Sequence, residues 1–149
     1  MISCVLFYIV ANIYIIPKLH TWSIKKIITP LLLLNCLRHL WLMFIAWGVV
    51  LPWMPIEFSY PASWWDFLSA ILAFIALYCI YYKEKYSKLS VQIFNIIWFL
   101  DFIMAITLSV LYKAWLFMWW SYRIPSFWVP MLLVSHYIIF LYLSKYWKQ

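Results

Sequence analysis

The sequence predicts an all-α bundle of helices that crosses a lipid bilayer several times. Of the 149 residues, 69% are hydrophobic and only 10% are charged, whereas a soluble domain is about half apolar and about a quarter charged. The apolar residues form long runs that short basic or proline-containing segments separate. One membrane-spanning helix needs about 20 apolar residues. The chain, 1–149, therefore has room for five spans in a single transmembrane domain.

The first two spans are predicted at residues 1–17 and 27–51. The first run is the shortest, and the bundle has four spans if this run fails to cross. Pro30 falls in the first predicted turn of the second span, where a missing N–H breaks no helical hydrogen bond. Pro52, Pro55 and Pro61 follow this span, and they predict a break in the chain.

The third and fourth spans are predicted at residues 62–82 and 89–112. Ser63 and Asp66 have the spacing of a helix-start signal, and an acidic residue also suits the positive end of a helix dipole. The basic segment at residues 83–88, KEKYSK, separates the two spans.

The fifth span is predicted at residues 124–143, with Pro125 at its start and a kink at Pro130. Residues 113–123 precede it and are rich in Trp and Tyr. These residue types concentrate where the membrane meets water. We therefore expect residues 113–123 to form an interfacial aromatic segment, either as a helix or as an extension of the fourth span.

The basic residues predict the orientation of the bundle. With five spans, most lysines fall on one side of the membrane, and positive loops face the cytoplasm. We therefore expect an outer N-terminus and a cytoplasmic C-terminus in a cell membrane, the inner membrane of a bacterium. Lysines scattered between spans do not form a nucleic-acid-binding surface, so no nucleic-acid partner is expected. The expected partners are the lipid bilayer and either a second copy of the chain or another subunit of a membrane complex. These lysines are Lys18, Lys25, Lys26, Lys83, Lys85, Lys88, Lys145 and Lys148.

Polar residues inside the spans predict a polar centre near the middle of the bilayer. Arg38 is the most informative of them, because a charged residue at that depth costs about 2.5–3.5 kcal/mol on insertion scales and normally pairs inside the bundle. Counting residues along each span places Asp101 and His136 at a similar depth. The predicted polar centre comprises Asn35, Arg38, Asp66, Asn95, Asp101 and His136.

The partners of Arg38 follow from depth and from helical geometry. Asp101 is the first choice because its depth matches, and Asp66 is the second because a long arginine side chain can extend toward the surface. We expect His136 to contribute a hydrogen bond to the Arg38–Asp101 pair. Asn95 and Asp101 are six positions apart, so they cannot both point at one partner.

Helical spacing also groups three residues of the second span. Asn35, Arg38 and His39 are three and four positions apart and are expected to share one face. A haem held by His39 and His136 is an alternative reading, but no cofactor and no metal site are predicted. The cysteines lie in apolar runs without metal-ligand spacing.

Several segments resemble a family of small, uncharacterised bacterial integral membrane proteins. The matching pieces include LLLLNCLR at residues 31–38, FNIIWFLD at residues 94–101 and YRIPSFWVPMLLVSH at residues 122–136. The family often has His where this chain has Asn35. The resemblance implies a set of important positions and names no activity. These positions are Arg38, Asp66, Asn95, Asp101, Pro125, Pro130 and His136.

Three functions are compatible with such a centre. The first is binding or transport of a small polar solute or a proton. The second is a membrane enzyme that acts on a lipid or quinone, with Asp101 or Asp66 as general base, His136 as acid and Arg38 holding an anion. The third is a structural or accessory subunit of a membrane complex, in which the polar groups only fix how the helices pack.

Overall fold

The computed structural model describes residues 2–147, so Met1, Lys148 and Gln149 lie outside the described residues. These residues contain helices, turns and bends and no strand, and the predicted all-α fold is confirmed. The five main helices are α1 (Ile2–Val10), α2 (Ile24–Cys36), α3 (Ile56–Tyr82), α4 (Glu84–Leu111) and α5 (Arg123–Leu141). A 3₁₀ segment, η3 (Leu37–Ile45), continues α2.

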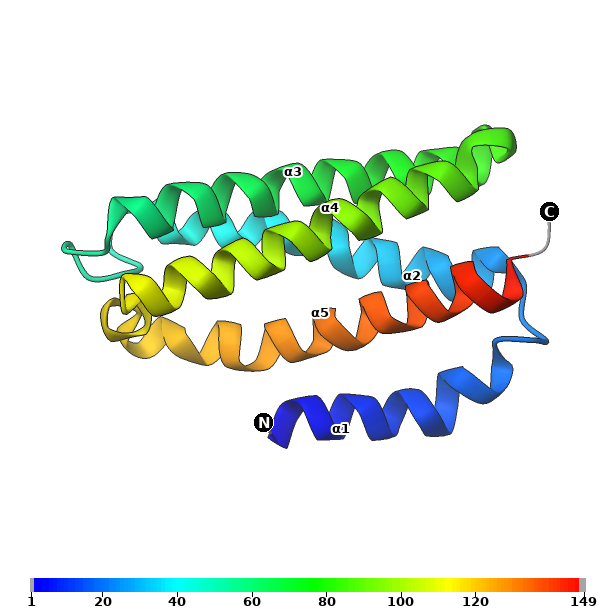
Figure 1. Ribbon diagram of the computed structural model, residues 1–149, viewed down its shortest axis with the longest axis horizontal. Helices are drawn as coiled ribbons and strands as arrows, with labels where there is room; N and C mark the ends of the chain where they lie inside the picture. Colours follow the sequence, from blue (N-terminus) through cyan, green and yellow to red (C-terminus); the bar gives the residue numbers. More distant parts are fainter. Residues whose placement is uncertain (1, 148–149) are drawn as a thin grey trace.

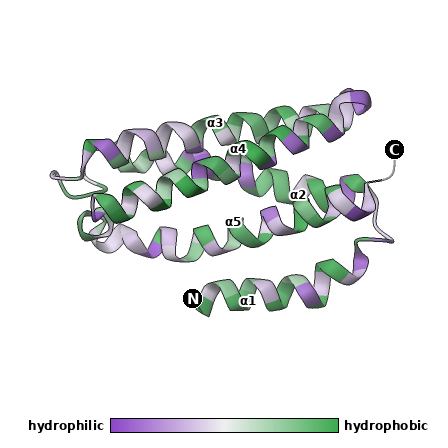
Figure 2. Cartoon of the chain, viewed as in Figure 1, coloured by the Kyte–Doolittle hydropathy of each residue, from purple (hydrophilic) through white to green (hydrophobic). Residues whose placement is uncertain are grey.

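Four helical stretches are long and apolar enough to cross a membrane. They are Ile24–Ile45, Ile56–Tyr82, Glu84–Leu111 and Trp119–Tyr146, and a shorter apolar helix covers Ile2–Lys18. Figure 1 shows them side by side as an elongated bundle, with α1 lying along α5. In Figure 2 most of their length is hydrophobic, and hydrophilic residues gather at the α3–α4 turn.

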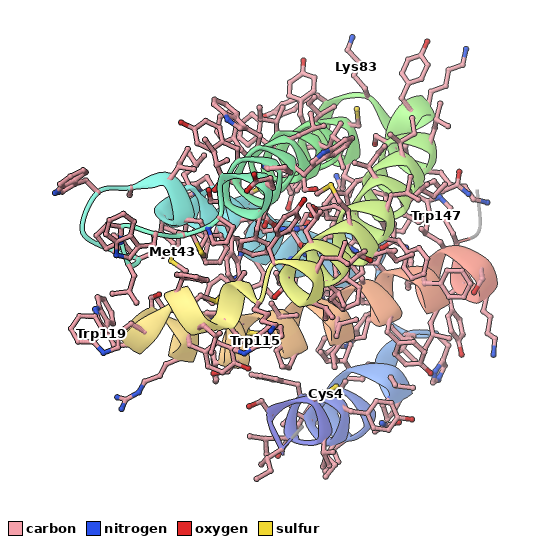
Figure 3. The ribbon with its side chains drawn as sticks, turned by 60° about the vertical axis from the view of Figure 1, so that its left-hand side comes forward. Cys4, Met43, Lys83, Trp115, Trp119 and Trp147 are labelled. Atoms are coloured by element: carbon pink, nitrogen blue, oxygen red, sulfur yellow. The ribbon has the colours of Figure 1, made fainter. Side chains whose placement is uncertain are left out.

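The two ends of the bundle differ in their residues. The α1–α2 link, the α3–α4 turn and the end of α5 lie at one end, and the η3–α3 loop and the α4–α5 link lie at the other (Figure 1). Figure 3 shows Lys83 projecting from the first end and Trp119 from the second. The lysine-rich segments of the described residues therefore share one end, as the orientation proposed below requires.

Two proline positions differ from the prediction. The second helical stretch covers Ile24–Ile45 rather than residues 27–51, and Pro30 lies inside α2 instead of in its first turn. Similarly, α3 begins at Ile56, so Pro61 lies inside it. Apolar membrane helices tolerate an internal proline because neighbouring helices and local adjustments satisfy the freed carbonyl. Proline therefore marks the end of a helix poorly in this chain.

Residues 113–123 do not form one continuous helix. They contain two short 3₁₀ turns, Ala114–Phe117 and Trp119–Tyr122. Lys113 and Trp119 have positive φ angles of 50° and 45°, a region in which an L-residue with a side chain is strained. A residue with a positive φ angle cannot continue a right-handed helix, so α4 does not continue through the aromatic segment.

The 3₁₀ geometry of η3 decides which of its residues face inward. Its buried side chains are Arg38, Trp41 and Phe44, at intervals of three, which is the period of a 3₁₀ helix. His39 is consequently turned outward and is exposed. The expectation that His39 shares the inner face of Arg38 is therefore wrong.

Small residues on α3 allow its neighbours to pack closely. Its buried positions include Ala62, Ser63, Ser69, Ala70, Ala73 and Ala76, and small residues are typical of contacts between membrane helices. Two apolar cores result, one around Phe94 and Leu32 and one around Trp41 and Phe58. Asp66 lies on α3 between the residues that belong to these two cores.

Candidate functional site

Arg38 binds two carboxylates from two different helices. Its Nε donates a hydrogen bond to Asp66 Oδ1 at 2.7 Å, and its Nη2 donates to the same oxygen and to Asp101 Oδ2, the latter at 2.5 Å. The three residues, here called the charged centre, are 3%, 7% and 2% exposed. The structure thus joins the two candidate partners of Arg38 in one site instead of choosing between them.

The charged centre is not balanced. One guanidinium faces two carboxylates, so the formal charges leave an excess of one negative charge. In addition, Arg38 Nη1 and Asp101 Oδ1 are buried without a hydrogen-bond partner among the described residues. An unpaired buried group of this kind costs about 1–3 kcal/mol, and more if it is charged. The centre therefore has both charge and hydrogen-bonding capacity left for another molecule.

A cavity of about 200 Å³ ends at the charged centre. Arg38, Asp66 and Asp101 contribute its charged lining, while its other walls are largely aromatic and aliphatic. Met118 and Val110 also line it, which places its other side near the α4–α5 link. The cavity is large enough for several water molecules or one small solute.

His136 belongs to a second polar cluster rather than to the charged centre. Its Nε2 lies 3.0 Å from Asn35 Oδ1, and its Nδ1 lies 2.6 Å from Asn95 Oδ1. Asn35 Nδ2 in turn donates to Leu31 O at 2.8 Å and to Ser135 Oγ at 3.2 Å. We call Asn35, Asn95, Ser135 and His136 the histidine cluster. The expected hydrogen bond from His136 to the Arg38–Asp101 pair is not made, because both ring nitrogens are engaged by amides.

The two clusters meet at Trp98. Its ring is stacked on the imidazole of His136, with centroids 3.6 Å apart and planes inclined by 7°. On the side of the charged centre, Arg38 Cζ lies 5.8 Å from the centroid of the Trp98 ring, within the range of a cation–π contact.

Trp98 was not among the residues expected in the polar centre. A tryptophan in an apolar run carries no signal by itself. The available signal is its position midway between Asn95 and Asp101, three residues from each, which on a helix places it between their directions. Ser135 was also not predicted. It directly precedes His136 on α5, and its Oγ accepts a hydrogen bond from Asn35 on α2.

His39, which lies in the second helical stretch, is part of neither cluster. His39 is exposed, and its Nδ1 is 2.9 Å from Cys36 O in the same helix, whereas His136 is buried. In the part of the chain that the structure describes, no group of three or more His, Cys, Asp or Glu side chains could hold a metal ion.

The comparisons with known proteins identify a family. Residues 1–144 match the family model described as a domain of unknown function (DUF8737). No curated protein and no solved structure matches the chain.

Proposed function

The chain belongs to this family of unknown function, and we propose from the geometry of its own residues that it binds a small polar solute or a proton within the membrane. The binding site is the charged centre, and the cavity beside it is the route of access. The observation that carries the proposal is the unbalanced ion cluster at the end of that cavity.

The charge excess defines what can bind. A buried negative charge without compensation is costly inside a membrane. A proton on one carboxylate removes the excess, and so does a solute that carries one positive charge. A solute at this position also needs an acceptor for Arg38 Nη1 and a donor for Asp101 Oδ1. These requirements favour a proton, water or a small protonated polar molecule over an anion.

The histidine cluster provides a second place for the same proton. Both ring nitrogens of His136 lie close to amide oxygens, and a protonated ring satisfies both contacts because both of its nitrogens then donate. With that proton and two ionised carboxylates, the two clusters together are neutral. When the proton leaves, Nδ1 becomes an acceptor, and a half-turn of the Asn95 amide restores the hydrogen bond. A proton can therefore reside on either side of Trp98.

The position of the cavity suggests from which side the site is reached. With an outer N-terminus and a cytoplasmic C-terminus, the α4–α5 link lies outside, and the cavity leads from that side to the charged centre. The basic segments then face the cytoplasm, in agreement with the positive-inside rule. Four or five helices are few for a transporter, so transport would require a homo-oligomer. We place the protein in the inner membrane of a bacterium.

A purely structural role is the second candidate, and one observation favours it. The ion pairs of Arg38 join η3 to both α3 and α4, so they can fix the packing of three helical segments. Buried ion pairs often contribute specificity of packing instead of net stability. In that role, the protein would be an accessory subunit of a membrane complex, and the cavity would have no solute.

Infrared spectroscopy of the purified protein in lipid nanodiscs at neutral pH tests the proposal. We expect the wild-type protein to contain a protonated carboxyl band, which shifts in D₂O, or an imidazolium band. Asp101→Asn removes the excess charge, so this band is expected to disappear. Glu57→Gln is the matched control, because Glu57 lies in the first turn of α3 and outside the charged centre. A wild-type spectrum with neither band would reject the bound proton.

A further inference from the structure

A groove runs along α4 and α5, and Trp98 separates it from the cavity of the charged centre. It has a volume of about 470 Å³ and is lined by Asn95, Trp98, Phe99, His136, Tyr137 and Phe140, among others. A second hollow of about 380 Å³ shares Asn95, Ile96 and Phe140 with it and continues to Leu143 and Ser144. Together these hollows form an elongated site that opens between two helices predicted to lie in lipid.

The groove is apolar except at one point. Its aromatic walls come from both helices, and Asn95 and His136 supply its polar side chains apart from the Tyr137 hydroxyl. The Asn95 side chain uses Oδ1 toward His136, and its Nδ2 makes no hydrogen bond to any described residue. An amide donor that faces hydrocarbon costs free energy unless an acceptor reaches it. The occupant must therefore bring an acceptor to this point.

The amide of Asn95 is held in place by the cluster behind it. Asn35 uses its Nδ2 for Leu31 O and Ser135 Oγ, so its Oδ1 remains for His136 Nε2. Stacking on Trp98 fixes the plane of the imidazole. The position of His136 then sets the position of Asn95 Oδ1 and directs Nδ2 away from the ring. The side chains of Asn35, Ser135, Trp98 and His136 thus hold the Asn95 amide in this orientation while His136 is protonated.

We propose that this groove binds a membrane-soluble quinone. A quinone ring is planar, uncharged and apolar, which suits the aromatic walls, and its carbonyl oxygen accepts from Asn95 Nδ2. The isoprenoid tail leaves the groove past Leu100 and Leu133, toward the middle of the bilayer. A phospholipid does not meet these requirements: its hydrocarbon chains have no acceptor, and its ester and head-group oxygens stay near the membrane surface. The groove is separate from the charged centre, but the assignment rests on the protonated His136 of the proposed function, because only in that state does Asn95 Oδ1 accept from the ring while Nδ2 faces the groove.

Binding of a short-chain ubiquinone analogue to the purified full-length protein in lipid nanodiscs tests this assignment. We expect saturable binding of the quinone and none of decylbenzene, which has a similar shape but no carbonyl. Asn95→Leu removes the donor and is expected to weaken binding about tenfold, the value of roughly one hydrogen bond. Asn12→Leu is the matched control, because Asn12 Nδ2 binds only Tyr8 O of its own helix.

A second variant keeps the amide intact and blocks the space. Ile96→Trp fills the groove and should abolish binding, while Ile103→Trp, at another exposed position of α4 outside the groove, should leave it unchanged. Equal binding of the quinone to the wild type and to Ile96→Trp would overturn the assignment. So would equal binding of decylbenzene and quinone, which would identify the groove as a site for hydrocarbon chains.

Discussion

The indole ring of Trp98 lies flat on the imidazole of His136, with 3.6 Å between the ring centroids. The same indole lines the cavity of the charged centre and the groove along α4 and α5. One aromatic ring thus separates the two polar clusters and supports the second. Because this ring packs on the imidazole and faces the guanidinium of Arg38, its loss should affect both clusters.

Truncation of Trp98 should therefore destabilise the protein strongly. For Trp98→Ala we expect a decrease of about 3–5 kcal/mol in the free energy of unfolding, typical of a large aromatic residue removed from a core. Trp98→Phe, which retains a ring, should lose less. Unfolding in mixed micelles with increasing SDS measures the change. Trp47, which is 100% exposed, provides the control. Equal stability of Trp98→Ala and Trp47→Ala would refute the role of Trp98.

Removing only the positive member of the charged centre should be more harmful than removing all three charges. Arg38→Met leaves two buried carboxylates together, and we expect it to cost about 3–5 kcal/mol. The triple variant Arg38→Met/Asp66→Leu/Asp101→Leu contains no buried charge and should regain most of that loss. The same SDS unfolding assay compares them. A triple variant less stable than Arg38→Met would show that the ion cluster itself holds the helices together.

The level of a residue along the bundle was predictable from the sequence, whereas rotation about the helix axis was not. Counting residues in apolar runs places Arg38 and Asp101 at one level because each residue adds a fixed rise. Both Asp66 and Asp101 were candidate partners, but only the packing of α3, α4 and η3 shows that Arg38 reaches both. His39 shows why rotation could not be predicted. The change from α to 3₁₀ geometry after Cys36 turns His39 outward, and no residue type in the sequence predicts that change.

Asn35 should be more important for stability than Ser135. Asn35→Leu removes the acceptor of His136 Nε2 and the donor to Ser135 Oγ, so we expect a loss of about 1–3 kcal/mol. Ser135→Ala should cost less, because Asn35 Nδ2 keeps its bond to Leu31 O. Ser126→Ala is a suitable exposed control. SDS unfolding measures the loss of stability of each variant. A larger loss for Ser135→Ala than for Asn35→Leu would contradict the hydrogen-bond network around Asn35.

Glycine at Lys113 should stabilise the protein. Lys113 has a φ of 50°, and a residue with a side chain pays a steric cost there that glycine avoids. Lys113→Gly is expected to gain up to about 1 kcal/mol, since the relief of strain exceeds the added flexibility of the unfolded chain. Tyr112, with a φ of −97°, should lose stability on the same replacement. Thermal unfolding measures both, and a destabilised Lys113→Gly variant would argue against the strained turn.

Composition and side-chain type account for the part of the site that was predictable. Charged and amide residues are conspicuous in apolar runs, so Asn35, Arg38, Asp66, Asn95, Asp101 and His136 could be selected before their contacts were known. Their division into two clusters depends on Trp98, one of 12 tryptophans in the chain. Nothing in the residue types distinguishes this ring from those that face lipid. Only the structure, in which Trp98 lies between His136 and Arg38, shows that this ring separates the two clusters.

The movement of protons across a membrane is the most direct test of the central claim in its transport form, in which the charged centre binds a proton and passes it across the bilayer. Purified protein is reconstituted in liposomes containing a pH-sensitive dye, and the decay of an imposed pH gradient is recorded with a potassium-selective ionophore present to prevent charge build-up. We expect the wild type and Glu57→Gln to dissipate the gradient faster than protein-free liposomes, and Asp101→Asn to be at least tenfold slower than the wild type. Equal rates for the wild type and Asp101→Asn would contradict the account.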